Sequence, residues 1–282
     1  MKLVVFLFTW LGAITFSCTS FATLISNQME NGKWKMETSP FQCKLSQDIY
    51  GFGTVAFIKE PQSSLAFVFS PDKNTKVTSL FVARVASELK LSEQPLSKGF
   101  VEGRYDEHGN FTFENATTEF IEAVNVGDRL FVKSRSGSET EIAVFTTLFG
   151  HHSVALFYQC MDDMSPLTWS AARFTELMFE NNHTQLSPSQ KQRLGVLMRY
   201  LPFDSTVTKI MVDGHSDDAG SNLANRMLSQ ERADEVAAHL IESGLDRNLL
   251  EVRAHGNRYP RKENNQLSSN RRVTIRLVKK VD

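Results

Sequence analysis

The chain has 282 residues, of which 41% are hydrophobic and 22% are charged, and its formal net charge is −1. This length and composition are typical of globular protein with room for two domains. Because the charges nearly balance, no overall field attracts nucleic acid or an anionic membrane surface, and we expect neither partner.

The first 22 residues have the pattern of an export signal. Met1-Lys2 forms a short basic start, an apolar run occupies residues 3–16, and Ser20-Phe21-Ala22 is a small-x-small cleavage site. The apolar run is shorter than the roughly 20 residues that a membrane-spanning helix needs. We therefore expect cleavage after Ala22 and an exported chain that does not span the membrane.

Two cysteines, Cys43 and Cys160, remain once the signal with Cys18 is removed. In an oxidising compartment such a pair forms a disulfide more readily than it stays reduced. Neither cysteine has a second cysteine or a histidine at ligand spacing, so no zinc site is expected. We predict a disulfide between them.

From Trp34 to about Tyr158 the chain predicts short strands separated by turns. Turn chemistry recurs, for example at Pro71-Asp72-Lys73-Asn74 and Val126-Gly127-Asp128. We expect an antiparallel all-β domain, barrel-like or sandwich, at residues 23–164. The predicted strands lie at residues 52–58, 65–69, 80–85, 111–113, 129–134, 141–146 and 153–157.

Helices and strands alternate after a boundary near residues 162–166, which predicts an α/β sandwich at residues 165–282, with helices on one side of a sheet. Ser187-Pro188-Ser189-Gln190 is a helix start, with serine at the N-cap, proline at N1 and glutamine at N3. A second, longer helix is expected between Gly220 and Gly244. The predicted strands lie at 173–179, up to Asp213, at 249–254 and at 272–278.

A polar loop joins the strand that ends at Asp213 to the longer helix. On that helix Asn225, Leu228 and Arg232 share one face, because they are three and seven residues apart. Asp217 in the loop can bind an ammonium group, and Arg232 can bind a carboxylate through two parallel hydrogen bonds. Together they can hold an amino acid that carries both charges. The alternative is that the two side chains pair only with each other or with solvent.

His215-x-Asp217, with Asp213 and Asp218 nearby, is the one cluster that suggests metal-assisted hydrolysis. The chain contains no His-Glu-x-x-His, no Gly-x-Ser-x-Gly and no phosphate-binding P-loop. An active site needs several positioned groups, and this is a single cluster. We therefore predict no enzymatic activity, no metal and no cofactor, and keep a metallohydrolase as the rival hypothesis.

The motifs Gly-His-Ser-Asp-x-x-Gly, Asn-x-x-Leu-Ser-x-x-Arg-Ala and Asn-Arg-Arg-Val, in this order, resemble the peptidoglycan-binding domain of the OmpA family. The resemblance implies that Asp217 and Arg232 hold the diaminopimelate of a cell-wall stem peptide. Two departures stand out: Ser216 replaces threonine but keeps the hydroxyl, and Gln266-Leu267 replaces a common Gly-Arg. The peptidoglycan-binding residues implied are Asp217, Arg232, Asn225, Ser216, Leu228 and Arg271.

The stretch 34–57 around Cys43, with Tyr158-Gln159-Cys160, resembles the MotY family of sodium-driven flagellar motor proteins. The order of signal, β-rich domain with two cysteines and OmpA-like domain is also that of the family. The resemblance implies a periplasmic, structural component of the T ring at the flagellar basal body, which contacts a MotX-like partner and supports stator assembly. The alternative is a general OmpA-like envelope tether that is not tied to motility.

Overall fold

The computed structural model describes residues 23–26, 33–72, 77–86, 99–147, 149–261 and 267–280, so the expected signal peptide at 1–22 lies outside the described residues. The chain divides into two compact units, neither of which is continuous in sequence. The first comprises Met1–Lys33, Gln47–Val55 and Val68–Gly150, and the second Trp34–Ser46, Ala56–Phe67 and His151–Asp282. The predicted domain limits near residue 164 stay a prediction.

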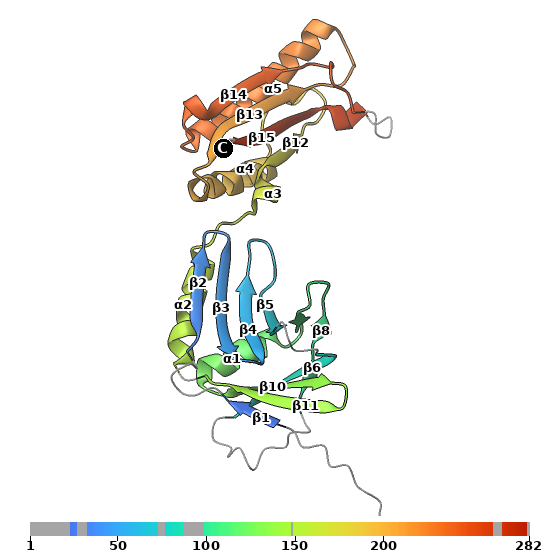
Figure 1. Ribbon diagram of the computed structural model, residues 1–282. Coiled ribbons are helices and arrows are strands. Elements are labelled where there is room, and N and C mark those ends of the chain that lie inside the picture. The colour runs from blue at the N-terminus through green and yellow to red at the C-terminus, as the bar shows by residue number, and fades with distance from the viewer. Residues whose placement is uncertain are drawn as a thin grey trace, which may run out of the picture. The chain divides into compact units, whose positions relative to one another are not determined.

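A five-stranded sheet lies in the first unit, in the order β1-β11-β10-β6-β7 (Figure 1). β10 pairs antiparallel with both β11 and β6, while β1 pairs parallel with β11. Helix α1, Thr117–Val126, places Phe120, Ile121 and Val124 in the interior and ends at Gly127, which has a φ of 91°. The strands are β1 Thr23–Ser26, β6 Ser79–Val85, β7 Val101–Glu102, β10 Arg129–Ser136 and β11 Glu139–Phe145.

A six-stranded sheet has the order β2-β3-β4-β5-β9-β8, and its residues are divided between the two units. The pairs β2–β3, β5–β9 and β8–β9 are antiparallel. The prediction of a mostly antiparallel β region is therefore confirmed. The strands are β2 Lys35–Ser39, β3 Gln42–Ile49, β4 Gly53–Lys59, β5 Ala66–Pro71, β8 Arg104–Tyr105 and β9 Phe111–Thr112.

The prediction of a strand at 153–157 is wrong, because these residues lie in helix α2, Gly150–Asp162. Val154 and Phe157 are both buried, and their spacing of three residues places them on one helical face. A short apolar run does not by itself distinguish a strand from part of a helix. Helix α1 was not predicted at all.

The disulfide between Cys43 and Cys160 is confirmed. It joins strand β3 to helix α2 across 117 residues of sequence, with a Cα–Cα distance of 6.0 Å. Both residues belong to the second unit, and Cys43 is fully buried.

The C-terminal region contains a four-stranded sheet in the order β12-β15-β13-β14, in which only β13 and β14 pair in parallel (Figure 1). The α/β prediction is confirmed. The strands are β12 Phe174–Met178, β13 Val207–His215, β14 Leu250–Ala254 and β15 Arg272–Lys279. The helices are α3 Trp169–Ala172, α4 Pro188–Tyr200 and α5 Asn222–Glu242, with short 3-10 turns at Leu201–Phe203, Arg247–Leu249 and Leu267–Asn270.

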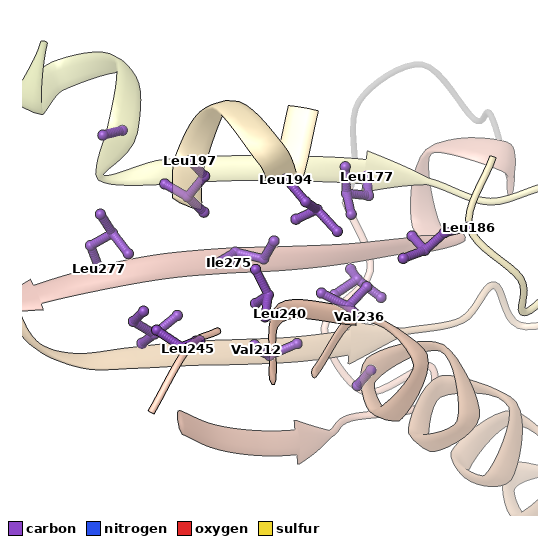
Figure 2. Packing of buried hydrophobic residues seen from close by; sticks show 14 of the residues in the cluster. Leu177, Leu186, Leu194, Leu197, Val212, Val236, Leu240, Leu245, Ile275 and Leu277 are labelled. Atoms are coloured by element: carbon purple, nitrogen blue, oxygen red, sulfur yellow. The ribbon is translucent and has the colours of Figure 1, made fainter. Parts of the chain in front are cut away.

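One face of this sheet is covered by helices α4 and α5. Figure 2 shows Leu194 and Leu197 of α4 and Val236 and Leu240 of α5 within one buried cluster that includes strand side chains such as Ile275. Successive strand residues point to opposite faces, so Asp213, His215, Thr274 and Arg276 project from the other face. Among the described residues, no helix combines the length and apolar character that crossing a membrane requires.

Candidate functional site

Close packing of helix α5 on strand β13 positions the predicted binding loop. A Cβ added at Gly214 would lie 2.0 Å from the carbonyl oxygen of Ser229 on the helix, so any side chain here would push helix and strand apart. The Ser229 hydroxyl also accepts a hydrogen bond from the Gly256 backbone N–H at 3.0 Å. Ser221 caps the start of α5 by accepting from the Ala224 backbone N–H. The helix start and the loop at 215–220 are thus held together.

Arg232 is completely buried, which is unusual for an arginine. Its Nε donates to the carbonyl oxygen of His183 at 2.8 Å, and its Nη2 donates to that of Glu180 at 3.0 Å. The guanidinium carbon lies 5.3 Å from the centre of the Phe179 ring. These contacts hold the guanidinium in one orientation. Among the guanidinium nitrogens, Nη1 makes no hydrogen bond to the described residues, and the pair of parallel hydrogen bonds from Arg232 to a carboxylate stays a prediction.

Asp217 is buried and pairs with Arg271 rather than with Arg232. The Asp217 Oδ2 atom lies 2.9 Å from Arg271 Nη1, and Asp217 Oδ1 accepts from the Ala219 backbone N–H at 3.3 Å. Arg271 Nε in turn donates to the carbonyl oxygen of Phe179. Asp217, Arg271 and Arg232 are close enough to interact electrostatically: burial lowers the pKa of Arg232, the Asp217 charge opposes this shift and the Arg271 charge adds to it.

Several buried polar atoms at this site have no hydrogen-bond partner among the residues that the structure describes. They are Ser216 Oγ, Asn225 Nδ2 and Arg232 Nη1, and all three residues are predicted site residues. Buried polar groups are nearly always paired, and each unpaired one costs about 1–3 kcal/mol. Leu228, on the same face of α5, is half-buried. The arrangement therefore offers two N–H donors, a hydroxyl and an apolar contact to a ligand with a carboxylate.

The opposite face of the sheet carries a charged cluster that the sequence analysis did not predict. Asp213 accepts hydrogen bonds from Arg253 at 2.8 Å, Arg276 at 3.0 Å and His255 at 2.8 Å. Burial alone would raise the pKa of Asp213, but these hydrogen bonds outweigh it and hold the pKa far below its ordinary value. Alternation along β13, β14 and β15 could have revealed the cluster, because Asp213, Arg253 and Thr274 are register partners.

His215 provides a pH-dependent contribution to stability. Burial, followed by the charge of Arg272, lowers the pKa of His215 from 6.5 to about 4. Below pH 6.5 the unfolded chain therefore takes up a proton that the folded chain does not. We predict that stability falls by about 2 kcal/mol from this group between pH 6.5 and 5. Urea denaturation at several pH values in this range measures the free energy of unfolding. This free energy should fall less steeply with decreasing pH in His215→Gln than in the wild type, and an equal fall would contradict the prediction.

The fold and the site define a two-domain protein whose C-terminal part is an OmpA-type α/β domain. Residues 178–274 match the model of the OmpA family. Residues 26–166, half of the 282 residues, match the model of the MotY N-terminal domain. The chain belongs to the family defined by the MotY N-terminal domain and carries an OmpA family domain after it.

Curated relatives are similar to part of the chain. The sodium-type flagellar protein MotY of Vibrio parahaemolyticus is 26% identical over 140 residues, which cover 49% of this chain and 47% of that protein. The outer-membrane lipoprotein YfiB of Pseudomonas aeruginosa is 33% identical over 110 residues, covering 38% and 65%. The peptidoglycan-associated lipoprotein of Buchnera aphidicola is 34% identical over 98 residues, covering 34% and 56%. The chain thus spans less than two thirds of each of these relatives.

Solved structures are similar to part of the chain. The peptidoglycan-associated lipoprotein of Burkholderia pseudomallei is 22% identical, with a TM-score of 0.34, and the match covers 37% of this chain and 89% of that one. The C-terminal domain of Helicobacter pylori MotB is 22% identical, with a TM-score of 0.35 and coverage of 38% and 85%.

Proposed function

We propose that the chain anchors to peptidoglycan through the site at the start of helix α5. The ammonium group of a diaminopimelate residue binds Asp217, and the carboxylate beside it accepts hydrogen bonds from Arg232 Nη1 and Asn225 Nδ2. The observation that carries this proposal is the group of buried, unpaired polar atoms on Ser216, Asn225 and Arg232. A ligand with both charges supplies the partners that these atoms lack.

In this proposal Arg271 gives way to the ligand at Asp217. The Arg271 guanidinium lies 2.9 Å from the Asp217 carboxylate. It therefore fills the position that the ligand ammonium takes in this proposal. Because Arg232 and Asp217 are both buried, the ligand enters by displacing Arg271 from Asp217. The released guanidinium then faces the ligand carboxylate, and the side chain of Leu228 contacts the ligand methylene groups. The role is binding, without a chemical reaction.

The whole chain, we infer, is a periplasmic structural component of the flagellar motor. Its membership of the MotY N-terminal domain family supports this, as does its likeness to a sodium-type flagellar protein. In this proposal the region at 23–164 contacts a MotX-like partner and the basal body in the T ring and supports stator assembly, while the region at 165–282 holds the assembly to the wall.

One experiment tests both parts of the proposal. A deletion strain is complemented with the wild-type gene, with Asp217→Asn or with Asp218→Asn, and each strain is scored for swimming and each purified chain for binding to sacculi. Asp218 is the matched control because it is adjacent and exposed. We expect Asp217→Asn to lose sacculus binding by at least about tenfold, since a charged hydrogen bond is lost, and to swim poorly.

The outcomes separate the alternatives. Normal swimming of the deletion strain would favour a general envelope tether over a motor component. Sacculus binding by Asp217→Asn at the level of Asp218→Asn would contradict the binding site itself.

A further inference from the structure

A hollow of about 420 Å³ lies on the face of the C-terminal sheet opposite helices α4 and α5. Its lining comes from β12, β13, β14 and β15 and from the segment after β14. This volume is within the range of small-molecule sites. The wall-binding residues Asp217, Arg232 and Arg271 are not part of its lining, so the hollow is a second feature of the same domain.

The lining is rich in positive charge. Arg253, Arg261, Arg272 and Arg276 face one acidic residue, Asp213. Glu176 and Glu251 pair with arginines at its margin: Arg261 with Glu176 at 2.8 Å, and Arg253 with Glu251 at 3.6 Å. Counting both glutamates still leaves one positive charge over, before any charge on histidine. The buried Asp213 carboxylate accepts hydrogen bonds from Arg253 and Arg276. These bonds fix the orientation of both guanidinium groups and of their remaining N–H groups.

Within the described part of the chain, two buried polar atoms of the lining have no hydrogen-bond partner, namely Arg272 Nε and His215 Nδ1. Arg272 is 6% exposed, and its other nitrogens donate to Asn270 and to the Tyr259 carbonyl oxygen. Its Nε is 3.8 Å from Glu176, which is too far for a hydrogen bond. Glu176 Oε1, the oxygen of this ion pair, also has no hydrogen-bond partner among the described residues. An acceptor oxygen of a bound anion would satisfy the Arg272 Nε–H.

We propose that this hollow binds a phosphate group carried by a small organic molecule or by a lipid. Four guanidinium groups, only partly balanced by Asp213, Glu176 and Glu251, suit an anion with several acceptor oxygens, and phosphate has these. The hollow exceeds the size of a bare ion. The His215 and His255 rings stack with centres 5.0 Å apart, and the Tyr259 ring meets His255 edge-on at 5.2 Å, so these rings provide an aromatic contact for the rest of the ligand. This inference is independent of wall binding.

The neighbouring residues Arg271 and Arg272 show how two sites coexist. Arg271 binds Asp217 in the wall-binding site, whereas Arg272 opposes His215 in the sheet register and lines the hollow. Since the two arginines contact different groups, with Arg271 just before β15 and Arg272 at its start, loss of one site need not affect the other. The wall-binding and phosphate-binding proposals can therefore fail separately.

Equilibrium dialysis of the purified full chain tests the proposal, with inorganic phosphate, glycerol 3-phosphate and succinate at constant ionic strength. Sedimentation with phosphatidylglycerol vesicles forms a further arm. The variant is Arg261→Gln/Arg276→Gln, whose side chains are 37% and 48% exposed. The matched control is Arg193→Gln/Arg199→Gln, two exposed arginines on α4.

We expect saturable binding of the phosphates, with the double variant weaker by on the order of tenfold per arginine and the control unchanged. Binding of soluble phosphates identifies a small solute, and binding of vesicles alone identifies a lipid headgroup; both support the phosphate site. Absence of phosphate and vesicle binding, equal affinity of the double variant, or equal affinity for succinate would overturn it.

Discussion

Replacing both Cys43 and Cys160 by serine is expected to lower the free energy of unfolding by about 5 kcal/mol. The disulfide closes a loop of 117 residues, and the chain-entropy model assigns this stabilisation to a loop of that length. The bridge ties helix α2 to strand β3, so its loss releases the helix from the sheet. Urea denaturation of the purified variant measures the effect.

Reduction of the wild-type chain is the matched control, because it breaks the same bond without changing the side-chain composition. Reduced wild type and the double-serine variant should unfold at the same urea concentration, well below the oxidised wild type. Equal stability of the oxidised wild type and the variant would show that the bridge does not hold α2 in place.

Local signals in the sequence predicted the C-terminal region well. The capping box at the start of α4 forms as expected, with Ser187 and Gln190 bonding to each other's backbone. Leu194 and Leu197 follow at helical spacing and are buried. These features depend on residues within one or two helical turns, and such local rules are sufficient to define them.

The region that precedes the C-terminal domain was harder to predict. There, packing between residues far apart in the chain outweighs the local preference for a strand or a helix. Residues 153–157 are apolar enough for a strand but form part of α2, which buries Val154 and Phe157. Cys160 lies on this helix and bonds to Cys43 on β3. Both the contacts and the bridge involve residues far away in the chain, and sequence periodicity over a few residues does not show them.

The candidate site was predicted residue by residue, but its internal contacts were not. Asp217 and Arg232 were expected to stand free for a ligand. In the structure Arg271, 54 residues away, holds Asp217, and carbonyl oxygens 49 and 52 residues away hold Arg232. Such long-range pairings are set by the fold. The Asp213 cluster was missed because Asp213 was considered only as a possible metal ligand, and Arg253, His255 and Arg276 were not considered as its neighbours across three strands.

The second large expected effect is on binding affinity, and it comes from changing the ligand instead of the protein. Diaminopimelate carries a carboxylate next to its terminal amine, and lysine has only the amine. A lysine peptide bound at the site would leave Arg232 Nη1 and Asn225 Nδ2 buried and unpaired, because neither atom has a partner among the described residues. Each unpaired group costs about 1–3 kcal/mol, so we expect the lysine peptide to bind roughly a hundredfold more weakly. This comparison changes no residue of the protein, and misfolding of a variant therefore cannot explain the result.

Calorimetric titration of the wild-type chain with two stem peptides, identical except for diaminopimelate or lysine at the third position, tests the zwitterion site most directly. We predict saturable binding of the diaminopimelate peptide and binding of the lysine peptide that is weaker by about two orders of magnitude. Equal affinity for the two peptides would contradict recognition of both charges by Asp217 and Arg232.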